Sequence, residues 1–246
     1  MSAAFSTDPR LAALYDGDNP DGPDHGYFLR RADRLSAATI VDLGCGTGIL
    51  TTTLASTGRH VVGVDPDAGM LAVARDRAGH ERVDWRLGDS SQIGTPGADL
   101  VLMTGNVAQH IGPDDWGRTL DDVAAALRTG GQVNFESRNP SLEAWRSWAD
   151  GGRLPTTRDT PFGPLTEWTD VSEPDHEGTV VLTCHNHWND SGDDVVVTLP
   201  LTFRTLDQIT RDLAGSGLDV IEIEGGWTGE PFDPTSPLMI ILAEKL

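Results

Sequence analysis

The stretch that decides the fold is Val41-Asp42-Leu43-Gly44-Cys45-Gly46-Thr47-Gly48, which follows an apolar run and precedes a helical pattern. Glycines at 44, 46 and 48 allow a tight turn between strand and helix, and a ligand can approach their backbone closely because no Cβ is in the way. A dinucleotide-binding fingerprint would need its third glycine at position 49, which is Ile49. The turn therefore predicts a cofactor site without the spacing typical of nicotinamide enzymes.

From residue 39 to 135, short apolar runs alternate with longer helical patterns, which is typical of βαβ units and a parallel sheet. The expected strands are Thr39–Leu43, His60–Val64, Val83–Leu87, Asp99–Met103 and Gly131–Glu136. The expected helices are Ile49–Thr57, Ala68–Ala78 and Asp114–Arg128, the last ended by Gly130 and Gly131. Right-handed crossovers place the loops after all these strands along one rim of the sheet, so a ligand should bind at that rim.

The pattern of predicted secondary structure changes beyond Pro140. Three longer strands without intervening helices are expected at Leu165–Val171, Thr179–Trp188 and Val195–Arg204, and they predict an antiparallel insertion. A helix capped by Thr205 and stopped by Gly217 should follow. Two closing strands are expected at Leu218–Glu224 and Pro237–Ala243.

Polar residues follow three of the rim strands. Asp65 stands 21 residues after Gly44, where a carboxylate can accept two hydrogen bonds from a ribose diol. Asp89 and Ser90 follow the third strand and could contact an adenine edge. The fourth strand ends at Met103 and is followed by Asn106, Gln109 and His110.

Composition excludes several classes of partner. The chain has 246 residues, with 18 Lys and Arg against 38 Asp and Glu, so its net charge is −20 and it should repel nucleic acids and anionic membranes. Cys45 and Cys184 are too few for a disulfide framework, which fits a reducing compartment. Residues 1–10 lack a signal-peptide pattern and no apolar run of about 18 residues occurs, so a cytoplasmic protein is expected.

These motifs, in this order and spacing, resemble the class I, seven-stranded S-adenosylmethionine-dependent methyltransferases of the small-molecule type. The resemblance covers residues 39–140 most strongly. It implies a three-layer, doubly wound α/β fold with a mostly parallel sheet of order 3-2-1-4-5-7-6, the last strand antiparallel, and an antiparallel β insertion after strand 5. The nucleic-acid amino-methyltransferases carry an Asn/Asp-Pro-Pro-aromatic motif where this chain has Thr104-Gly105-Asn106-Val107, so that branch is disfavoured.

The resemblance also assigns cofactor contacts. Gly44 and Gly46 would face the methionyl part of S-adenosylmethionine, Asp65 the ribose, and Asp89 with Ser90 the adenine. Met103 would shield the adenine or ribose, and Tyr27 could belong to a lid over the cofactor. The full predicted cofactor set is Tyr27, Gly44, Cys45, Gly46, Asp65, Pro66, Met70, Asp89, Ser90 and Met103.

Catalysis requires few groups because the sulfonium methyl is already activated, so positioning of the nucleophile dominates. His110 and Glu136 are the candidate proton acceptors, although an amine can also enter neutral without any base. The candidate substrate contacts are Asn106, Gln109, Arg138 and Asn139. His185 and His187 share a strand face but lack a third ligand, so no metal site is predicted. Tryptophans beyond Pro140 could line a substrate pocket or pack in a core.

The predicted function is methyl transfer from S-adenosylmethionine, with S-adenosylhomocysteine as product, to an O or N atom of a small metabolite, with natural-product biosynthesis as a candidate setting. The alternatives are an NAD(P)-dependent oxidoreductase on a similar sheet and a non-catalytic S-adenosylmethionine-binding module. A single methyltransferase domain, monomeric or homodimeric, is expected. Its parts would be a helical lid at 1–38, a cofactor-binding core at 39–140, the β insertion over the active site at 141–204, and a closing helix and strands at 205–246.

Overall fold

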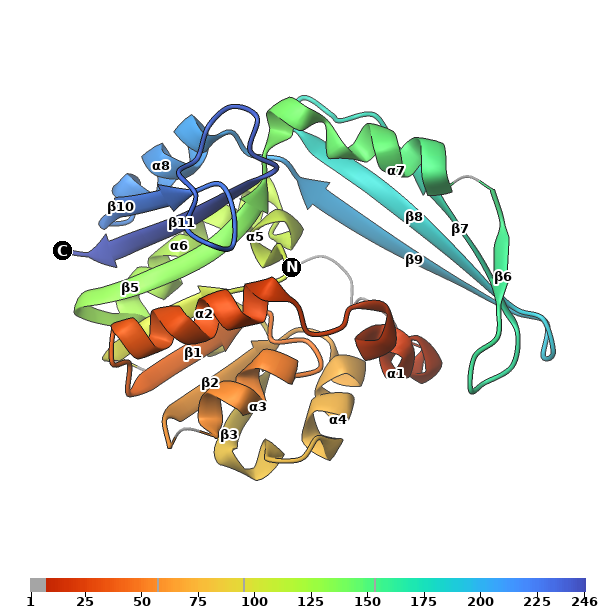
Figure 1. Cartoon of the computed structure of the whole chain (residues 1–246), viewed down its shortest axis with the longest axis horizontal. Helices are drawn as coiled ribbons and strands as arrows, with labels where there is room; N and C mark the ends of the chain where they lie inside the picture. The colour runs from red at the N-terminus through yellow and green to blue at the C-terminus, as the bar shows by residue number, and fades with distance from the viewer. Residues whose placement is uncertain (1–7, 57, 95, 153) are drawn as a thin grey trace.

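A seven-stranded sheet forms the centre of the protein in a computed structural model that describes residues 8–56, 58–94, 96–152 and 154–246 (Figure 1). The strand order is β10-β11-β5-β4-β1-β2-β3, and β11 runs antiparallel to both of its neighbours. The predicted fold class and strand order are therefore confirmed. The strands are β1 (Thr39–Leu43), β2 (His60–Asp65), β3 (Val83–Leu87), β4 (Ala98–Met103), β5 (Leu127–Arg138), β10 (Leu218–Glu224) and β11 (Leu238–Lys245).

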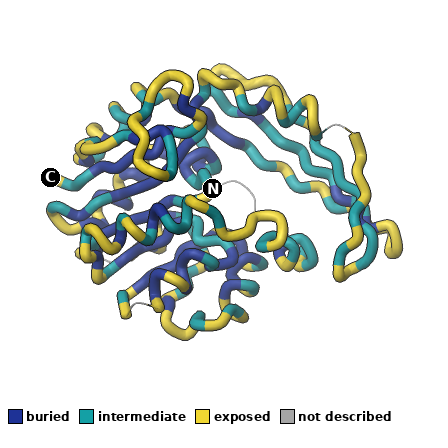
Figure 2. Tube along the Cα trace, in the orientation of Figure 1, coloured by how far each residue is buried: buried dark blue, intermediate teal, exposed yellow. Residues whose placement is uncertain are grey.

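Helices cover both faces of this sheet, because successive residues of a buried parallel strand point to opposite faces and both sets are apolar. Val41 lies in the hydrophobic cluster under α6 and α8, whereas Ile40 lies in the cluster under α2 and α3. The helices are α1 (Pro9–Asp18), α2 (Pro23–Arg34), α3 (Ile49–Ala55), α4 (Ala68–Asp76), α5 (Val107–His110), α6 (Pro113–Ala126), α7 (Ala144–Gly152) and α8 (Leu206–Gly215), with short 3-10 turns η1 (His80–Arg82), η2 (Ser90–Gln92) and η3 (Pro140–Leu142). Figure 2 shows the buried residues concentrated in the sheet.

The predicted antiparallel insertion is present as a second sheet of order β6-β7-β8-β9. Its strands are β6 (Thr156–Arg158), β7 (Leu165–Val171), β8 (Thr179–Trp188) and β9 (Asp193–Thr202). Two elements of this region were not predicted, β6 and helix α7. Trp145 of α7 is buried against Val180, Leu201 and Phe203, so this amphipathic helix is stabilised by packing on the insertion.

One prediction about the end of α6 is wrong. The Gly130–Gly131 pair does not stop that helix, which ends at Ala126, and strand β5 already begins at Leu127. The pairing with β4 jumps from Ala98↔Leu127 to Leu100↔Gln132, so the glycines lie in an irregularity of the strand. A Cβ on Gly131 would come within 2.8 Å of the Ala98 carbonyl oxygen, which explains glycine there.

Other predicted boundaries agree to within a few residues, and the Thr205 cap is present with Gln208 as its reciprocal partner. The predicted end of the Ile49–Thr57 helix, at Thr57, lies outside the described residues. Among the described residues, no helix is both long enough and apolar enough to cross a membrane.

Candidate active site

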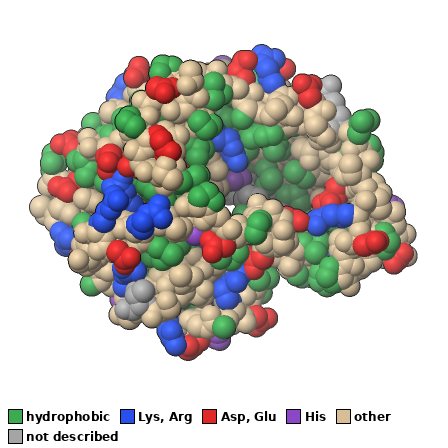
Figure 3. All heavy atoms as spheres, in the orientation of Figure 1, with side chains coloured by type: hydrophobic (Ala, Val, Ile, Leu, Met, Phe, Trp, Pro, Cys, Tyr) green, Lys and Arg blue, Asp and Glu red, His purple; other side chains and the backbone are tan. Residues whose placement is uncertain are grey.

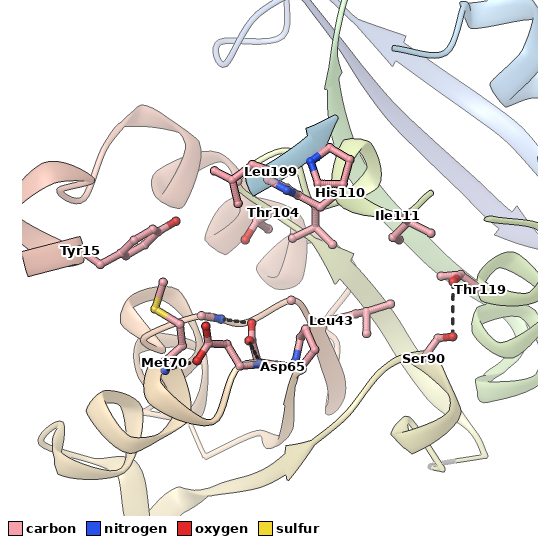
Figure 4. A pocket seen from close by; sticks show the side chains of 17 residues that line it. Tyr15, Leu43, Asp65, Met70, Ser90, Thr104, His110, Ile111, Thr119 and Leu199 are labelled. Carbon is pink, nitrogen blue, oxygen red and sulfur yellow. Dashed lines mark hydrogen bonds between the residues drawn. The ribbon is translucent and has the colours of Figure 1, made fainter. Parts of the chain in front are cut away.

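A cavity lies at the carboxyl ends of β1, β2 and β4, between the sheet and the insertion (Figures 3 and 4). It comprises roughly 900 Å³ of space, part of it open to solvent. Figure 3 shows a hollow with a largely hydrophobic wall and with cationic and histidine side chains at its edge. The lining residues are Tyr15, Leu43, Gly44, Gly46, Asp65, Pro66, Asp67, Met70, Ser90, Thr104, Gly105, Val107, His110, Ile111, Thr119, Leu199 and Pro200.

The three glycines of the turn differ in what an added side chain would meet. A Cβ on Gly44 would lie 2.4 Å from Val107 Cγ2, and one on Gly48 would lie 2.5 Å from the Trp85 ring, so protein packing excludes a side chain at both. Gly46 has a φ of +54°, lines the cavity, and would meet no described protein atom within 4 Å of an added Cβ. Only Gly46 therefore leaves space that a ligand can use.

Asp65 joins the glycine turn to the segment that follows β2 at one side of the cavity. Its Oδ2 accepts a hydrogen bond from the Gly46 backbone N–H at 2.8 Å, and its Oδ1 accepts one from the Asp67 N–H at 2.8 Å. Burial raises the pKa of this carboxyl to about 6, although the two backbone donors oppose the shift. At neutral pH it is an anion that keeps acceptor capacity for a ligand hydroxyl.

His110 lies across the cavity from Asp65, at the end of α5, with Thr104 and Leu199 beside it (Figure 4). Burial, and secondarily the charge of Arg138, lower the pKa of this imidazole to about 4. The ring is therefore neutral at pH 7 and has a nitrogen lone pair that can accept a hydrogen bond.

Helix α1 brings Tyr15 to the side of the cavity where Asp65 and Met70 lie (Figure 4). Asp16 accepts a hydrogen bond from Thr47 Oγ1 at 2.5 Å and forms an ion pair with Arg77, so the helix is tied to the glycine turn. Burial, together with the charge of Asp65, raises the pKa of the Tyr15 phenol. Helix α1 thus contributes the aromatic ring of Tyr15 to this wall of the cavity.

Seven of the predicted cofactor and catalytic residues line the cavity. They are Gly44, Gly46, Asp65, Pro66, Met70, Ser90 and His110. The cavity also has lining residues that the sequence did not single out as site residues, among them Val107, Ile111, Thr119, Leu199 and Pro200. The insertion residues carry no local signal, because long-range packing alone brings β9 to the rim.

Four predicted cofactor residues do not line the cavity. Tyr27 packs edge-on against Phe28 and Trp227 on the other side of α2, with ring centroids 5.2 and 5.6 Å away. Met103 is fully buried in the core, since its side chain points to the α6 face of the sheet. The remaining two are Cys45, whose thiol lies near Gly63, and Asp89, whose carboxylate caps η2 and pairs with Arg118.

Two of the predicted polar residues at the end of β5, Glu136 and Asn139, lie behind the lining residues instead of on the cavity. Glu136 is 1% exposed, and its Oε1 accepts a hydrogen bond from the Asn106 backbone N–H at 2.5 Å. Burial raises the pKa of Glu136 to about 7. Asn139 is also buried, and its Nδ2 donates to the backbone oxygens of Pro234 and Ser236. Glu136 and Asn139 thus stabilise the loops behind the site.

Gln109 and Arg138 contact each other beside the cavity. Gln109 is 1% exposed, and its Oε1 accepts a hydrogen bond from Arg138 Nη1 at 2.9 Å. The Arg138 guanidinium also lies 5.0 Å from the ring centroid of Trp148, in helix α7 of the insertion. This pair therefore joins the core to the insertion.

The sheet order, the glycine turn and the buried carboxylate after β2 together define a fold of the class I methyltransferase type. Residues 40–131 match the family described as "Methyltransferase domain". The ubiquinone biosynthesis O-methyltransferase of Bradyrhizobium sp. (strain ORS 278) is 31% identical over 145 residues, which are 57% of this chain and 55% of that protein. The chain thus spans about half the length of the first such relatives it matches.

Two further similarities cover more of the chain. The cypemycin N-terminal methyltransferase of a Streptomyces species is 27% identical over 219 residues, 86% of this chain and 84% of that protein. The structure of S-adenosylmethionine-bound CalS10, an amino pentose methyltransferase from Micromonospora echinaspora, superposes with a TM-score of 0.67 at 20% identity over 100% of this chain and 99% of that one. Residues 40–131 thus match a methyltransferase domain, and the chain as a whole shares the fold of an S-adenosylmethionine-bound methyltransferase.

The residues present fit this cofactor. A Cβ at position 46 would fill the space above Gly46, and the Asp65 carboxylate borders the same space. The Gly46 backbone can therefore hold the methionyl part of the cofactor and the Asp65 carboxylate its ribose. Met70, Pro66 and Ser90 provide an apolar surface and a hydroxyl for the base.

Proposed function

We propose that this protein transfers a methyl group from S-adenosylmethionine to an amino nitrogen of a small molecule. When bound, the cofactor supplies an electrophilic methyl group on its sulfonium. The protein's own residues then have to bind the acceptor, orient its nucleophile and exclude water. The single observation that supports the proposal is the cavity, in which Asp65 and His110 lie on opposite sides of one space large enough to have a cofactor side and an acceptor side.

The state of His110 favours nitrogen over an aliphatic hydroxyl as the acceptor atom. A neutral amine carries its own lone pair and needs only a hydrogen-bond acceptor to orient it, whereas an alcohol must lose its proton as it attacks. An imidazole whose pKa is lowered to about 4 is a weak base but still a good hydrogen-bond acceptor. His110 would therefore orient the amine through an unprotonated ring nitrogen. The relatives that act on an N-terminus and on an amino pentose support the same choice.

Parts of the chain take distinct roles in this proposal. Residues 1–38 would act as a helical lid through Tyr15 and the Asp16 ties, and residues 39–140 as the cofactor-binding core. Residues 141–204 would form the acceptor wall through Leu199 and Pro200, while residues 205–246 close the sheet.

The test is an acceptor screen with methyl-labelled S-adenosylmethionine, in which small amines, phenols and alcohols are incubated with the protein and labelled products are identified by mass spectrometry. The proposal predicts S-adenosylhomocysteine release together with a label on nitrogen. Label on a phenol or alcohol oxygen alone contradicts the choice of acceptor atom. Cofactor binding without turnover on any acceptor instead favours the non-catalytic binding module.

A further inference from the structure

Arg138 is a half-buried cation in an acidic protein, yet no carboxylate oxygen of the described residues lies within 4.0 Å of it. Other arginines of the chain, such as Arg31 and Arg158, each pair with two carboxylates. The charge of Glu136, a fully buried group whose Oε1 accepts a hydrogen bond from the Asn106 backbone N–H, acts on Arg138 without forming an ion pair with it. With a net charge of −20, the chain has many acids available, so a desolvated arginine left without one needs another explanation.

Arg204 is a buried arginine of the same region whose guanidinium is used for contacts within the protein. Arg204 donates to the backbone oxygens of Ala108 at 2.8 Å and Ile111 at 2.7 Å, and it stacks on Trp116 at 4.3 Å. Both of its Nη atoms are thus used within the protein. Arg138 has only the hydrogen bond from Nη1 to Gln109, so among the described residues its Nε and Nη2 donors have no partner.

The guanidinium is nevertheless held in place. Gln109 is buried and fixes Nη1, and the Trp148 ring covers one face of the group. A planar guanidinium held this way presents its free Nε–H and Nη2–H side by side, which matches the two oxygens of a carboxylate or two oxygens of a phosphate.

Arg138 lies next to the acceptor side of the cavity. Its charge contributes to the lowered pKa of His110, which lines that side, and Gln109 directly precedes His110 in the chain. A molecule whose amine contacts His110 can therefore carry an anionic group to Arg138.

We propose that Arg138, oriented by Gln109 and Trp148, binds an oxyanion of the methyl acceptor, either a carboxylate or a phosphate. This inference rests on the proposed function and specifies the class of methyl acceptor. The acceptor would be a small molecule that carries both an amino group and an oxyanion, with the two placed to reach His110 and Arg138 together. Neutral amines of the same shape would be poor substrates.

The proposal is tested by calorimetric titration of the full-length protein saturated with S-adenosylhomocysteine. The probes are benzoate, phenyl phosphate and neutral benzamide, which share one ring and differ in the anionic group. Arg138→Gln should weaken binding of the favoured anion by about 10-fold or more, because charge-assisted bidentate bonds are lost. Arg146→Gln is the matched control, since Arg146 is exposed on α7 and pairs only with Glu143. Arg138→Lys should give an intermediate affinity.

The two anions separate a carboxylate site from a phosphate site. Equal binding of the anions by wild type and Arg138→Gln, or equal binding of benzamide and both anions by wild type, overturns the proposal. Failure of both anions to bind wild type also overturns it. Loss of affinity for S-adenosylhomocysteine itself in Arg138→Gln assigns the arginine to the cofactor's carboxylate instead. Failure of the proposed function is seen separately, as absence of cofactor binding or turnover in wild type.

Discussion

Asp65 offers a sharp test of how the cofactor side of the cavity operates. The carboxylate is 7% exposed, is bonded to two backbone N–H groups, and borders the space above Gly46. Asp65→Asn keeps the shape but removes the charge. Losing a charge-assisted hydrogen bond to the ribose costs about 1.5 to 3 kcal/mol, so S-adenosylmethionine should bind roughly 10- to 150-fold more weakly.

The pH dependence of binding gives an independent measure of the same group. Because burial raises the pKa of Asp65 to about 6, the carboxyl is ionised above pH 6 and becomes protonated below it. A protonated carboxyl is a poorer acceptor for the ribose hydroxyls, so wild-type affinity should fall about tenfold between pH 7 and pH 5. The Asp65→Asn variant should show no such fall.

Isothermal titration calorimetry at both pH values measures both effects. Asp84→Asn is the matched control, since Asp84 is exposed on β3 and pairs with Arg86 outside the cavity. A folded Asp65→Asn protein that binds S-adenosylmethionine with wild-type affinity at pH 7 would refute the ribose assignment. A pH profile shared by wild type and variant would show that another group controls binding.

Three further predictions concern stability and turnover. Glu136→Gln should raise the free energy of unfolding by about 3 kcal/mol at pH 8 in urea titrations, because ionising this buried carboxyl costs stability. The pKa of Glu136 in the folded protein is about 7 and exceeds the ordinary value of 4.5, so this gain in stability should vanish below pH 4.5. Gly48→Ala should lower the free energy of unfolding by about 1 to 3 kcal/mol, because an alanine there is strained by its positive φ and its Cβ meets the Trp85 ring. Gly58→Ala has a similar φ but open space around the Cβ, so it should lower the free energy of unfolding by less. His110→Gln should lower turnover about 10- to 100-fold with cofactor affinity within twofold; unchanged turnover would remove His110 from the acceptor side.

The fold could be predicted well because it depends on patterns local to each element. The apolar runs at β1 and β4 mark strands buried on both faces, and Thr205 with Gln208 marks a helix start. The glycine pair at 130–131 misled the prediction of α6, since glycine serves a helix end and a strand irregularity equally well. Helix α7 was missed because its helicity depends on packing against β7 and Phe203.

The candidate site could be predicted only where a residue follows directly from its strand. Asp65 and Gly46 occupy positions that the strand-turn-helix geometry determines. Tyr15 and Tyr27 both precede β1, and only the packing of α2 on the sheet shows that Tyr27 turns away from the cavity. Leu199 reaches the site through strand pairing far along the chain, which no local pattern reveals.

The most direct test of the central claim is side-by-side calorimetric titration of the purified protein with S-adenosylmethionine, S-adenosylhomocysteine and NAD(H). A cavity organised by Gly46 and Asp65, without the third glycine of a dinucleotide fingerprint, predicts tight binding of the first two ligands and none of NAD(H). Preference for NAD(H), or no binding of any of the three, would contradict the account.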